Sequence, residues 1–473
     1  MLTVSRRRLL AAALGPLLPN MLRLRPAIAD DMTFPENFAW GASTSSYQIE
    51  GAVDIDGRGK SIWDTFSHSP GRVRGGDTGD VACDHYHRWA EDVELLARGA
   101  FTDYRFSMAW PRVLPDGGGI VEPRGLDFYD RLVDGLAARG ITPWLCLYHW
   151  DLPQALEDRG GWRDRDTAAK FADYATIAAK RLGDRVKHWI TFNEPNIHAL
   201  FGYGTGEHAP GVKGLPNMLK AMHNQNLAHG RAVQALRAER ADFRLGTVVS
   251  LQQARPASDR DEDRRAAERF DAMWNGACLD PQMLGRYAAP VAGDFAPLVI
   301  GDDLATMHQP LDFIGMNYYA PMYVEDAPDS LFGAWFGALP PGTPVTAMGW
   351  PVDAASLTDE LARISARYNK PDIYITENGA CYEEIVAADG VVHDAERVAY
   401  LQDHLAAAQR AIAAGVNLRG YFVWSLLDNF EWAQGYGRRF GIVRVDFDKP
   451  DLRRTPKASY QWLAEFIAQQ KRR

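Results

Sequence analysis

The sequence is short of cysteine, with four residues scattered over 473 positions. Cys83, Cys146, Cys278 and Cys381 form no C-x-x-C pair and none of the spacings of a zinc site. Cys146 lies in the apolar run WLCLY and is most simply a small buried residue. The sequence therefore requires no disulfide framework and predicts no structural metal.

Basic residues are fewer than acidic residues, and the sequence also contains no recognisable linker between domains. The chain has 52 Lys and Arg residues against 61 Asp and Glu residues, which gives a net charge of −9. This balance argues against nucleic acid or an anionic membrane surface as a partner. After the first 29 residues, no Gly/Ser linker, low-complexity tract or break in composition divides the chain. A single globular domain over residues 30–473 is therefore predicted.

The first 29 residues are predicted to be an export signal. Arg6–Arg8 precede the apolar stretch Leu9–Leu18, which is about half as long as a membrane span, and Ala27-Ile28-Ala29 is a small-x-small cleavage site. The arrangement resembles a bacterial twin-arginine signal, whose arginine pair is read as an address. We expect export to the bacterial periplasm and cleavage after Ala29. The net charge would fall from −9 to −14, because five arginines and no acidic residue are lost. The alternative is a disordered basic extension or a misplaced start codon, which leaves the protein in the cytoplasm.

From about residue 34 to residue 468, short apolar runs alternate with longer amphipathic stretches. Runs without polar alternation are typical of parallel strands that are buried on both faces. The predicted strands are 37–43, 102–110, 141–149, 188–194, 244–251, 312–319, 372–378 and 418–426. The predicted helical stretches include 91–98, 125–139, 166–182, 217–239, 261–275, 394–413 and 457–470. Eight β–α repeats predict an α/β protein with a single (β/α)8 TIM barrel, and segment 325–353 is predicted to be an insertion after the sixth strand.

Two glutamates stand where predicted strands end. Glu194 ends the fourth strand, in HWITFNEPN, and Glu377 ends the seventh, in DIYITENGA. Side chains at the C-terminal ends of barrel strands converge on a common mouth, where active sites lie. Strands four and seven are expected to lie across the barrel from each other, so that both carboxylates can meet one ligand. Further polar side chains at strand ends are Arg105, His149, Asn193, Asn317 and Tyr319.

A pair of carboxyl groups can cleave a glycosidic bond. One protonates the leaving oxygen, and the other attacks the anomeric carbon or activates a water. A separation of about 5–5.5 Å gives retention and one of about 6.5–9.5 Å gives inversion, which the sequence leaves open. Glu377 shares the mouth with Arg105, whose charge favours an ionised nucleophile. Glu194 has Asn193 beside it and no nearby basic residue, so a raised pKa and the role of the acid are predicted.

These residues lie in stretches that together resemble glycoside hydrolase family 1, the retaining β-glucosidases, from about Phe34 to Gln469. The matching stretches are FAWGASTSSYQIEGA, YRFSMAWPRV, LYHWDLPQAL, TFNEP, GMNYY, YITENG and WSLLDNFEWAQGYGRRFG. The resemblance implies that Glu377 is the nucleophile, that Glu194 is the acid/base, and that Arg105 and Tyr319 contact the nucleophile. It implies a β-glucoside or cello-oligosaccharide as substrate and no cofactor.

The resemblance also implies a set of substrate-binding residues. Asn193 would hold the 2-hydroxyl of the terminal sugar, and Glu431-Trp432 is the pattern of members that take sugars without phosphate. Gluco, galacto and fuco configurations are all compatible with Gln48 and Glu431, so side activities are expected. The full set of implied binding residues is Gln48, His149, Asn193, Asn317, Tyr319, Trp350, Trp424, Glu431, Trp432 and Phe440.

One position departs from the family pattern and leaves the leaving-group preference open. After TFNEP the family commonly has a bulky residue that lines the leaving-group side, whereas this chain has Asn196. Trp350, in AMGW, is a candidate for stacking there instead. The identity of the alcohol that leaves is therefore not predicted.

Two other functions are weighed against the glycosidase. A non-catalytic sugar-binding barrel would lack at least one of the two glutamates, and both are present. A metal-dependent barrel hydrolase would carry His-x-His at the end of the first strand, which here reads WGAST. His85-Tyr86-His87 and Glu207-His208 lie in loops without a third ligand fixed by spacing, so structural roles are predicted for both.

Overall fold

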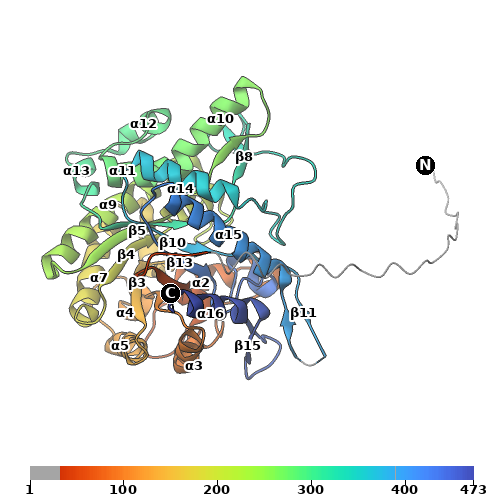
Figure 1. Ribbon diagram of the computed structural model, residues 1–473. Coiled ribbons are helices and arrows are strands. Elements are labelled where there is room, and N and C mark those ends of the chain that lie inside the picture. Colours follow the sequence, from red (N-terminus) through yellow and green to blue (C-terminus); the bar gives the residue numbers. More distant parts are fainter. Residues whose placement is uncertain (1–31, 389, 473) are drawn as a thin grey trace, which may run out of the picture. The chain divides into compact units, whose positions relative to one another are not determined.

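Eight parallel strands form a closed barrel at the centre of the fold (Figure 1). The computed structural model describes residues 32–388 and 390–472, so the predicted export signal lies outside the described residues. The strands follow chain order around the barrel, and β13 pairs with β1 to close it. Their bounds are β1 (Ala39–Ser43), β2 (Asp103–Ser107), β3 (Thr142–Tyr148), β4 (His188–Asn193), β5 (Arg244–Ser250), β7 (Phe313–Asn317), β10 (Ile373–Asn378) and β13 (Leu418–Trp424). The predicted (β/α)8 barrel is confirmed, and each strand falls within its predicted range.

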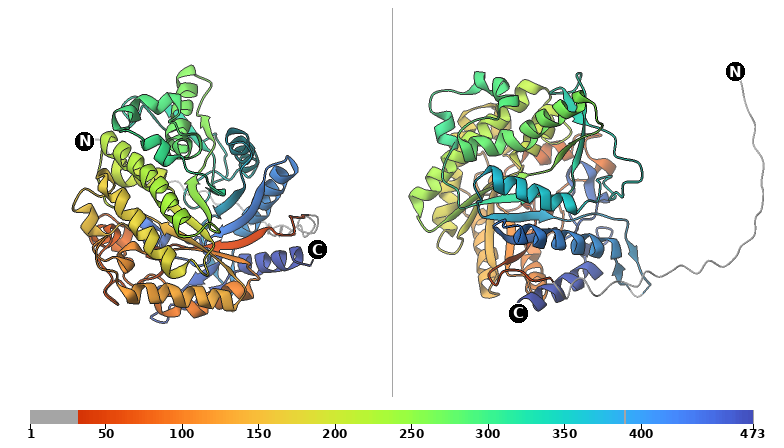
Figure 2. Two further views of the ribbon diagram at one scale, coloured as in Figure 1. Left: turned by 90° about the vertical axis from the view of Figure 1, so that its left-hand side faces the viewer. Right: turned by 45° about the horizontal axis from the view of Figure 1, so that its top comes forward.

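Helices form an outer ring around these strands (Figure 2). Their apolar residues recur at helical spacing, as in α5, where Leu126, Leu132 and Leu136 are buried. Within the described part of the chain, no helix combines the length and apolar character that a membrane crossing needs. The principal helices are α3 (His85–Arg98), α5 (Pro123–Ala138), α7 (Asp166–Leu182), α9 (Leu215–Glu239), α10 (Asp261–Asp271), α11 (Ala277–Leu284), α14 (Ala355–Arg367), α15 (Ala395–Ala413) and α16 (Ala458–Gln470).

The barrel interior is filled by side chains and is not a pore. Trp144 lies at its centre, with the rings of Phe313, Tyr374 and Phe422 at centroid distances of 5.2, 4.7 and 5.2 Å. Its indole N–H donates to Asp103 Oδ1 at 2.7 Å, which satisfies the one polar atom of the ring. Because this core blocks the interior, a ligand can bind only beyond the strand ends.

The predicted insertion 325–353 contains regular structure that the sequence pattern did not indicate. Its first part forms a small sheet with β6 (Ala254–Pro256), in which β8 (Met322–Asp326) is the central strand and β9 (Ala334–Phe336) pairs antiparallel to β8. Strands of three to five residues are too short to show a period. The sheet brings the loop after β5 and the loop after β7 together at the mouth of the barrel.

Candidate active site

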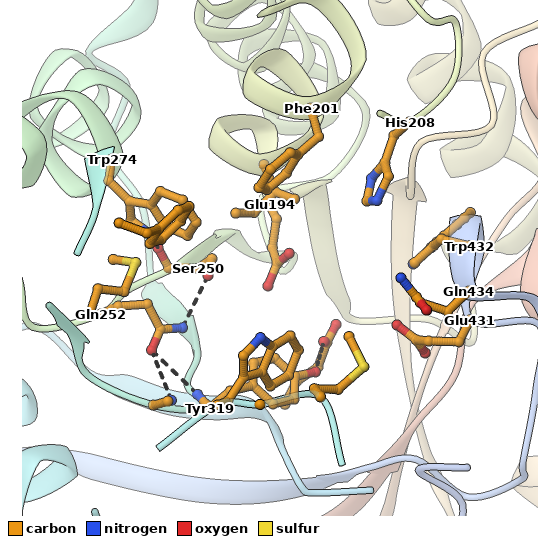
Figure 3. Close-up of a pocket in the computed structure, with 18 of the residues that line it drawn as sticks. Glu194, Phe201, His208, Ser250, Gln252, Trp274, Tyr319, Glu431, Trp432 and Gln434 are labelled. Carbon is orange, nitrogen blue, oxygen red and sulfur yellow. Dashed lines mark hydrogen bonds between the residues drawn. The ribbon is translucent and has the colours of Figure 1, made fainter. Parts of the chain in front are cut away.

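A cavity of about 570 Å³ opens at the C-terminal ends of the barrel strands. Most of the residues predicted to form the site line it, and the labelled ones point into a common space (Figure 3). The predicted residues that line the cavity are His149, Asn193, Glu194, Tyr319, Trp350, Glu377, Trp424, Glu431, Trp432 and Phe440.

The two glutamates are placed by irregular strand ends. Glu377 belongs to β10, whose pairing with β7 shifts register between Ile375 and Glu377. Glu194 follows β4 and precedes Pro195, which disfavours helical backbone at the residue before it. Glu194 has a φ of 45°, a left-handed conformation that is strained for a residue with a side chain. The two strands were predicted to lie across the barrel from each other. In the structure β4 and β10 are three positions apart, with β5 and β7 between them, whereas directly opposite strands of an eight-stranded barrel are four positions apart.

Glu377 is held by a cation and a phenol. Arg105, fully buried on β2, donates from Nη1 to Glu377 Oε1 at 2.5 Å. Tyr319 Oη donates to the other oxygen, Oε2, at 2.6 Å. Both carboxylate oxygens are thus fixed by charge-assisted hydrogen bonds, which favour the ionised form and a single orientation.

Glu194 has no cation in direct contact. Asn317 Nδ2 donates to Glu194 Oε1 at 2.8 Å and also to Asn193 Oδ1 at 2.9 Å. Asn193 Oδ1 in turn accepts from Arg105 Nη2 at 2.6 Å. The amides of Asn193 and Asn317 therefore stand between the Arg105 guanidinium and Glu194. Glu377, in contrast, contacts the guanidinium directly.

These surroundings displace the two pKa values unequally. Burial, followed by the charge of Glu377, raises the pKa of Glu194 well above its ordinary value. Burial also raises the pKa of Glu377, but Arg105 and the Tyr319 hydrogen bond oppose that rise. The pKa of Glu194 is therefore raised with little opposition, whereas the rise at Glu377 is opposed by a cation and a hydrogen bond.

Three predicted residues stand behind the cavity lining. Arg105 and Asn317 are fully buried and act on the glutamates from below the floor of the cavity. Gln48 is fully buried as well, with Oε1 accepting from Ser45 Oγ and Nε2 donating to Asn429 Oδ1 and the Phe430 carbonyl. Gln48 is not among the residues that line the cavity, and a direct contact with a sugar stays a prediction.

Comparison with known proteins identifies the family. The family profile described as glycosyl hydrolase family 1 matches residues 30–472. The chain belongs to glycosyl hydrolase family 1. The resemblance inferred from seven short stretches is thereby confirmed over nearly the whole length of the chain.

Family 1 relatives match at high coverage. β-Glucosidase A of Thermotoga maritima is 46% identical over 439 residues, which are 92% of this chain and 97% of that protein. A bifunctional β-D-glucosidase/β-D-fucosidase of Bifidobacterium breve is 44% identical over 465 residues, with coverages of 92% and 98%. Among solved structures, a psychrophilic β-glucosidase from Micrococcus antarcticus superposes with a TM-score of 0.90 at 44% identity, covering 94% of this chain and 99% of that chain.

The carboxyl group of Glu431, in the same cavity, has surroundings unlike those of Glu194 and Glu377. Burial, followed by the charge of Glu377, raises the pKa of Glu431 to about 8. Its Oε2 is buried and has no hydrogen-bond partner among the described residues. A buried polar atom without a partner is costly, and a ligand hydroxyl would satisfy it. Figure 3 shows the Glu431 side chain reaching into the cavity beside Gln434.

His149 lies in the same cavity as Glu194 and Glu377, in surroundings that favour its neutral form. Burial and the nearby charge of Arg105 lower its pKa well below the ordinary value. Its Nε2 accepts from Asn193 Nδ2 at 2.9 Å, which leaves Nδ1 protonated as a donor. Nδ1 is buried and has no partner within the described ranges 32–388 and 390–472. His149 can therefore donate to an acceptor on a ligand.

Several cavity residues were not predicted from the sequence. Trp274 lies in a π-helical turn, 272–276, between α10 and α11, inside a stretch that reads as ordinary helix. Asn196, which left the leaving-group preference undecided in the sequence, donates to the carbonyls of Ser250 and Trp274 at 2.9 and 3.0 Å and so fixes the backbone that presents Trp274. The other lining residues missed include Phe201, Ser250, Gln252, Phe336 and Gln434.

The two candidate metal sites, His85/His87 and Glu207-His208, have other surroundings. His85 Nδ1 lies 2.8 Å from Asp92 Oδ2, and His87 Nδ1 lies 2.5 Å from Asp84 Oδ1. Glu207 and His208 both line the cavity, with Glu207 exposed. Among the described residues, no three His, Cys, Asp or Glu side chains are grouped so as to hold a metal ion. The four cysteines are free and buried.

Proposed function

We propose that this protein is a retaining β-glucosidase that removes terminal, non-reducing β-D-glucosyl residues from small β-glucosides. It is a family 1 hydrolase of O-glycosidic bonds. The observation that carries the proposal is the unequal environment of two buried carboxyl groups, one facing Arg105 and Tyr319, the other facing only amides. That asymmetry supplies an ionised nucleophile and a protonated acid in one cavity.

The reaction would proceed in two displacements. Glu377 attacks the anomeric carbon and forms a glycosyl–enzyme ester, while Glu194 gives its proton to the glycosidic oxygen and the alcohol leaves. Glu194 then takes a proton from water, the water oxygen bonds to the anomeric carbon, and the ester bond to Glu377 breaks. Arg105 and Tyr319 fix the attacking carboxylate throughout, and two inversions restore the β configuration.

The terminal sugar would bind on the side of Glu431 and Trp432. Glu431 Oε2 and His149 Nδ1, which lack partners in the described part of the protein, would bond to its hydroxyl groups. Trp424 and Trp432 flank the ring of His149 at centroid distances of 5.9 and 5.7 Å and offer apolar faces to the sugar ring. The name of the Bifidobacterium relative supports side activity on β-D-fucosides, and β-galactosides are proposed as well.

Release of nitrophenol from nitrophenyl β-D-glucoside tests the activity. We expect steady turnover by the purified protein, with slower release from the β-galactoside and β-fucoside. Saturable binding of the glucoside without any nitrophenol release would instead support a non-catalytic sugar-binding barrel.

A pH profile of Tyr319→Phe tests the assigned ionisations. The acid limb of kcat/KM is set by ionisation of Glu377, and the alkaline limb by loss of the proton from Glu194. The Tyr319 hydrogen bond lowers the pKa of Glu377, so its removal raises that pKa and moves the acid limb to higher pH. Loss of a hydrogen bond to a charged group is also expected to lower kcat by about tenfold or more. An acid limb that stays in place, or moves to lower pH, would argue against Glu377 as the ionising group.

We further propose export to the bacterial periplasm through the twin-arginine route. The support is the sequence of residues 1–29, with Arg6–Arg8 before an apolar stretch and a small-x-small site at its end. In a bacterium with this route, we expect a periplasmic protein that begins at Asp30. Replacing Arg6, Arg7 and Arg8 together by lysine should leave the uncleaved chain in the cytoplasm. Equal export of both forms would contradict the twin-arginine assignment.

A further inference from the structure

One stretch of chain, residues 428–441 and here called the sugar-side segment, supplies several residues of the cavity lining. Figure 3 shows three of them, Glu431, Trp432 and Gln434, close together at the cavity. Glu431 Oε2 has no partner among the described residues, so no hydrogen bond from the protein fixes that oxygen. The position of this carboxyl group therefore depends on how the backbone of the segment is held. The lining residues of the segment are Glu431, Trp432, Ala433, Gln434 and Phe440.

Asp428 joins the two ends of the sugar-side segment. Its Oδ1 accepts from the backbone N–H of Gly441 at 3.0 Å, and its own N–H donates to the Val443 carbonyl at 2.9 Å. Its Oδ2 accepts from Arg439 Nη1 at 2.8 Å. The two ends approach so closely that a Cβ at Gly441 would collide with the backbone nitrogen of Asp428. The segment is thus a loop that one carboxylate closes at its base.

Lys457, which lies outside the cavity lining, holds the same carboxylate. The side chain is fully buried, and its Nζ donates to Asp428 Oδ1 at 2.8 Å and to Glu384 Oε1. The backbone N–H of Lys457 donates to the Ile442 carbonyl at 2.9 Å, one residue beyond the sugar-side segment. Lysine is almost never fully buried unless it is paired. The ammonium group is therefore fixed at the base of the loop by two carboxylates.

Glu384 connects this base to the loop that follows Glu377. It accepts from Arg397 Nη2 at 3.1 Å. Arg397, fully buried on α15, also donates from Nε to the Ala380 carbonyl at 3.0 Å and from Nη2 to the Arg439 carbonyl at 2.8 Å. A continuous set of buried charges therefore joins the loop after Glu377 to the base of the sugar-side segment.

We infer, on the basis of the proposed β-glucosidase function, that Lys457 is a positioning residue that fixes Glu431 for the terminal sugar. Its ammonium group neutralises and orients the Asp428 carboxylate, which closes the sugar-side segment. Removal of the ammonium would leave a buried carboxylate without one of its partners, which is costly, and a shift of the segment relieves that cost. Glu377 is affected less, because a cation and a phenol hold both of its oxygens. Glu431 lacks such support, so the contact with the sugar is the one that changes.

A double-mutant cycle with Glu431 tests this inference. Lys457→Met keeps an unbranched side chain and removes the charge. We expect it to lower kcat/KM for dinitrophenyl β-D-glucoside by about tenfold and to raise the Ki of glucose, as a competitive inhibitor, by a similar factor. In a Glu431→Ala background, the same change should lower kcat/KM by less than about twofold, because the contact that Lys457 positions is already absent. The melting temperature should fall by the same amount in both backgrounds.

An equal loss of kcat/KM in both backgrounds would overturn the inference and leave the β-glucosidase activity intact. Absence of turnover by the wild-type protein would instead refute the proposed function. Asp303→Asn is the matched control for a weakened buried ion pair, since Asp303 pairs with Arg165 and His223 outside the cavity lining. It should lower the melting temperature while the Ki of glucose stays within about twofold of the wild-type value.

Arg439→Met gives the same test if Lys457→Met does not fold. The Arg439 side chain is 19% exposed and donates to the other oxygen of Asp428, so its loss is better tolerated. We expect kcat/KM for dinitrophenyl β-D-glucoside to fall by about threefold in the wild-type background and to stay unchanged in the Glu431→Ala background. Equal losses in the two backgrounds would again overturn the inference.

Discussion

Replacing Glu377 by glycine is expected to lower kcat for nitrophenyl β-D-glucoside by about 10⁴-fold or more. The variant loses the carboxylate that Arg105 and Tyr319 hold in place, so no covalent intermediate can form. Steady-state assays at high enzyme concentration measure the loss. Glu325→Gly, which removes an exposed carboxylate on β8, is the control and should retain the wild-type kcat.

Small anions distinguish loss of the nucleophile from loss of the fold. Glycine leaves a space beside Arg105 in which azide can bind and attack the anomeric carbon from the face that Glu377 occupied. The expected product is the α-glucosyl azide, because a single displacement inverts the β configuration. A variant that stays inactive with azide although its thermal unfolding is cooperative, or that yields the β-glucosyl azide, would count against Glu377 as the nucleophile.

Replacing Glu194 by alanine is expected to have an effect that depends on the leaving group. Departure of a sugar or alkyl alcohol requires a proton, so kcat/KM for such glucosides should fall by about 10³–10⁴-fold. Dinitrophenolate leaves without protonation, and kcat/KM for dinitrophenyl β-D-glucoside should stay within about tenfold of the wild-type value. The two substrates are compared on one enzyme preparation, so the fraction of folded protein cancels.

An equal loss on both substrates would argue that Glu194 positions the substrate and does not supply the proton. The same experiment with azide gives a second readout. With the acid removed, azide enters on the face that Glu194 occupied after the covalent intermediate has formed. It should therefore yield the β-glucosyl azide, the opposite outcome to that expected of the Glu377 variant.

The barrel and the position of two carboxylates at its mouth were predictable from the sequence for a simple physical reason. Parallel strands buried on both faces appear as short apolar runs, and eight of them can be counted without knowing how they pack. A carboxylate at the end of such a run has to lie at the barrel mouth, as Glu194 and Glu377 do. Arg105 was expected at a strand end, but it stands in the middle of β2 and reaches Glu377 through its long side chain.

The cavity wall around Trp274 and Phe336 could not be predicted, because its parts have no local signal. Trp274 stands in a stretch with ordinary helical character, and only the π-helical turn between α10 and α11 turns it toward the cavity. Phe336 lies on a three-residue strand that exists through its pairing with β8. The occupied state of the Gln252 amide depends on backbone groups far away in the chain. Such features follow from tertiary contacts and not from residue type.

The pKa values of the buried carboxyl groups in the cavity could not be predicted from the sequence either. Arg105 was expected to favour an ionised Glu377, and the structure adds that burial raises the pKa of both glutamates. The pKa of Glu431, raised to about 8, had no sequence signal, since its cause is burial next to Glu377. Burial of a charge is a property of the assembled site.

The anomeric form of the first product tests the central claim most directly. Hydrolysis of nitrophenyl β-D-glucoside is followed by proton NMR within minutes, before the released glucose mutarotates. Two displacements at the anomeric carbon, by Glu377 and then by water activated by Glu194, predict β-glucose as the first product. First appearance of α-glucose would contradict the covalent mechanism and the roles assigned to the two glutamates.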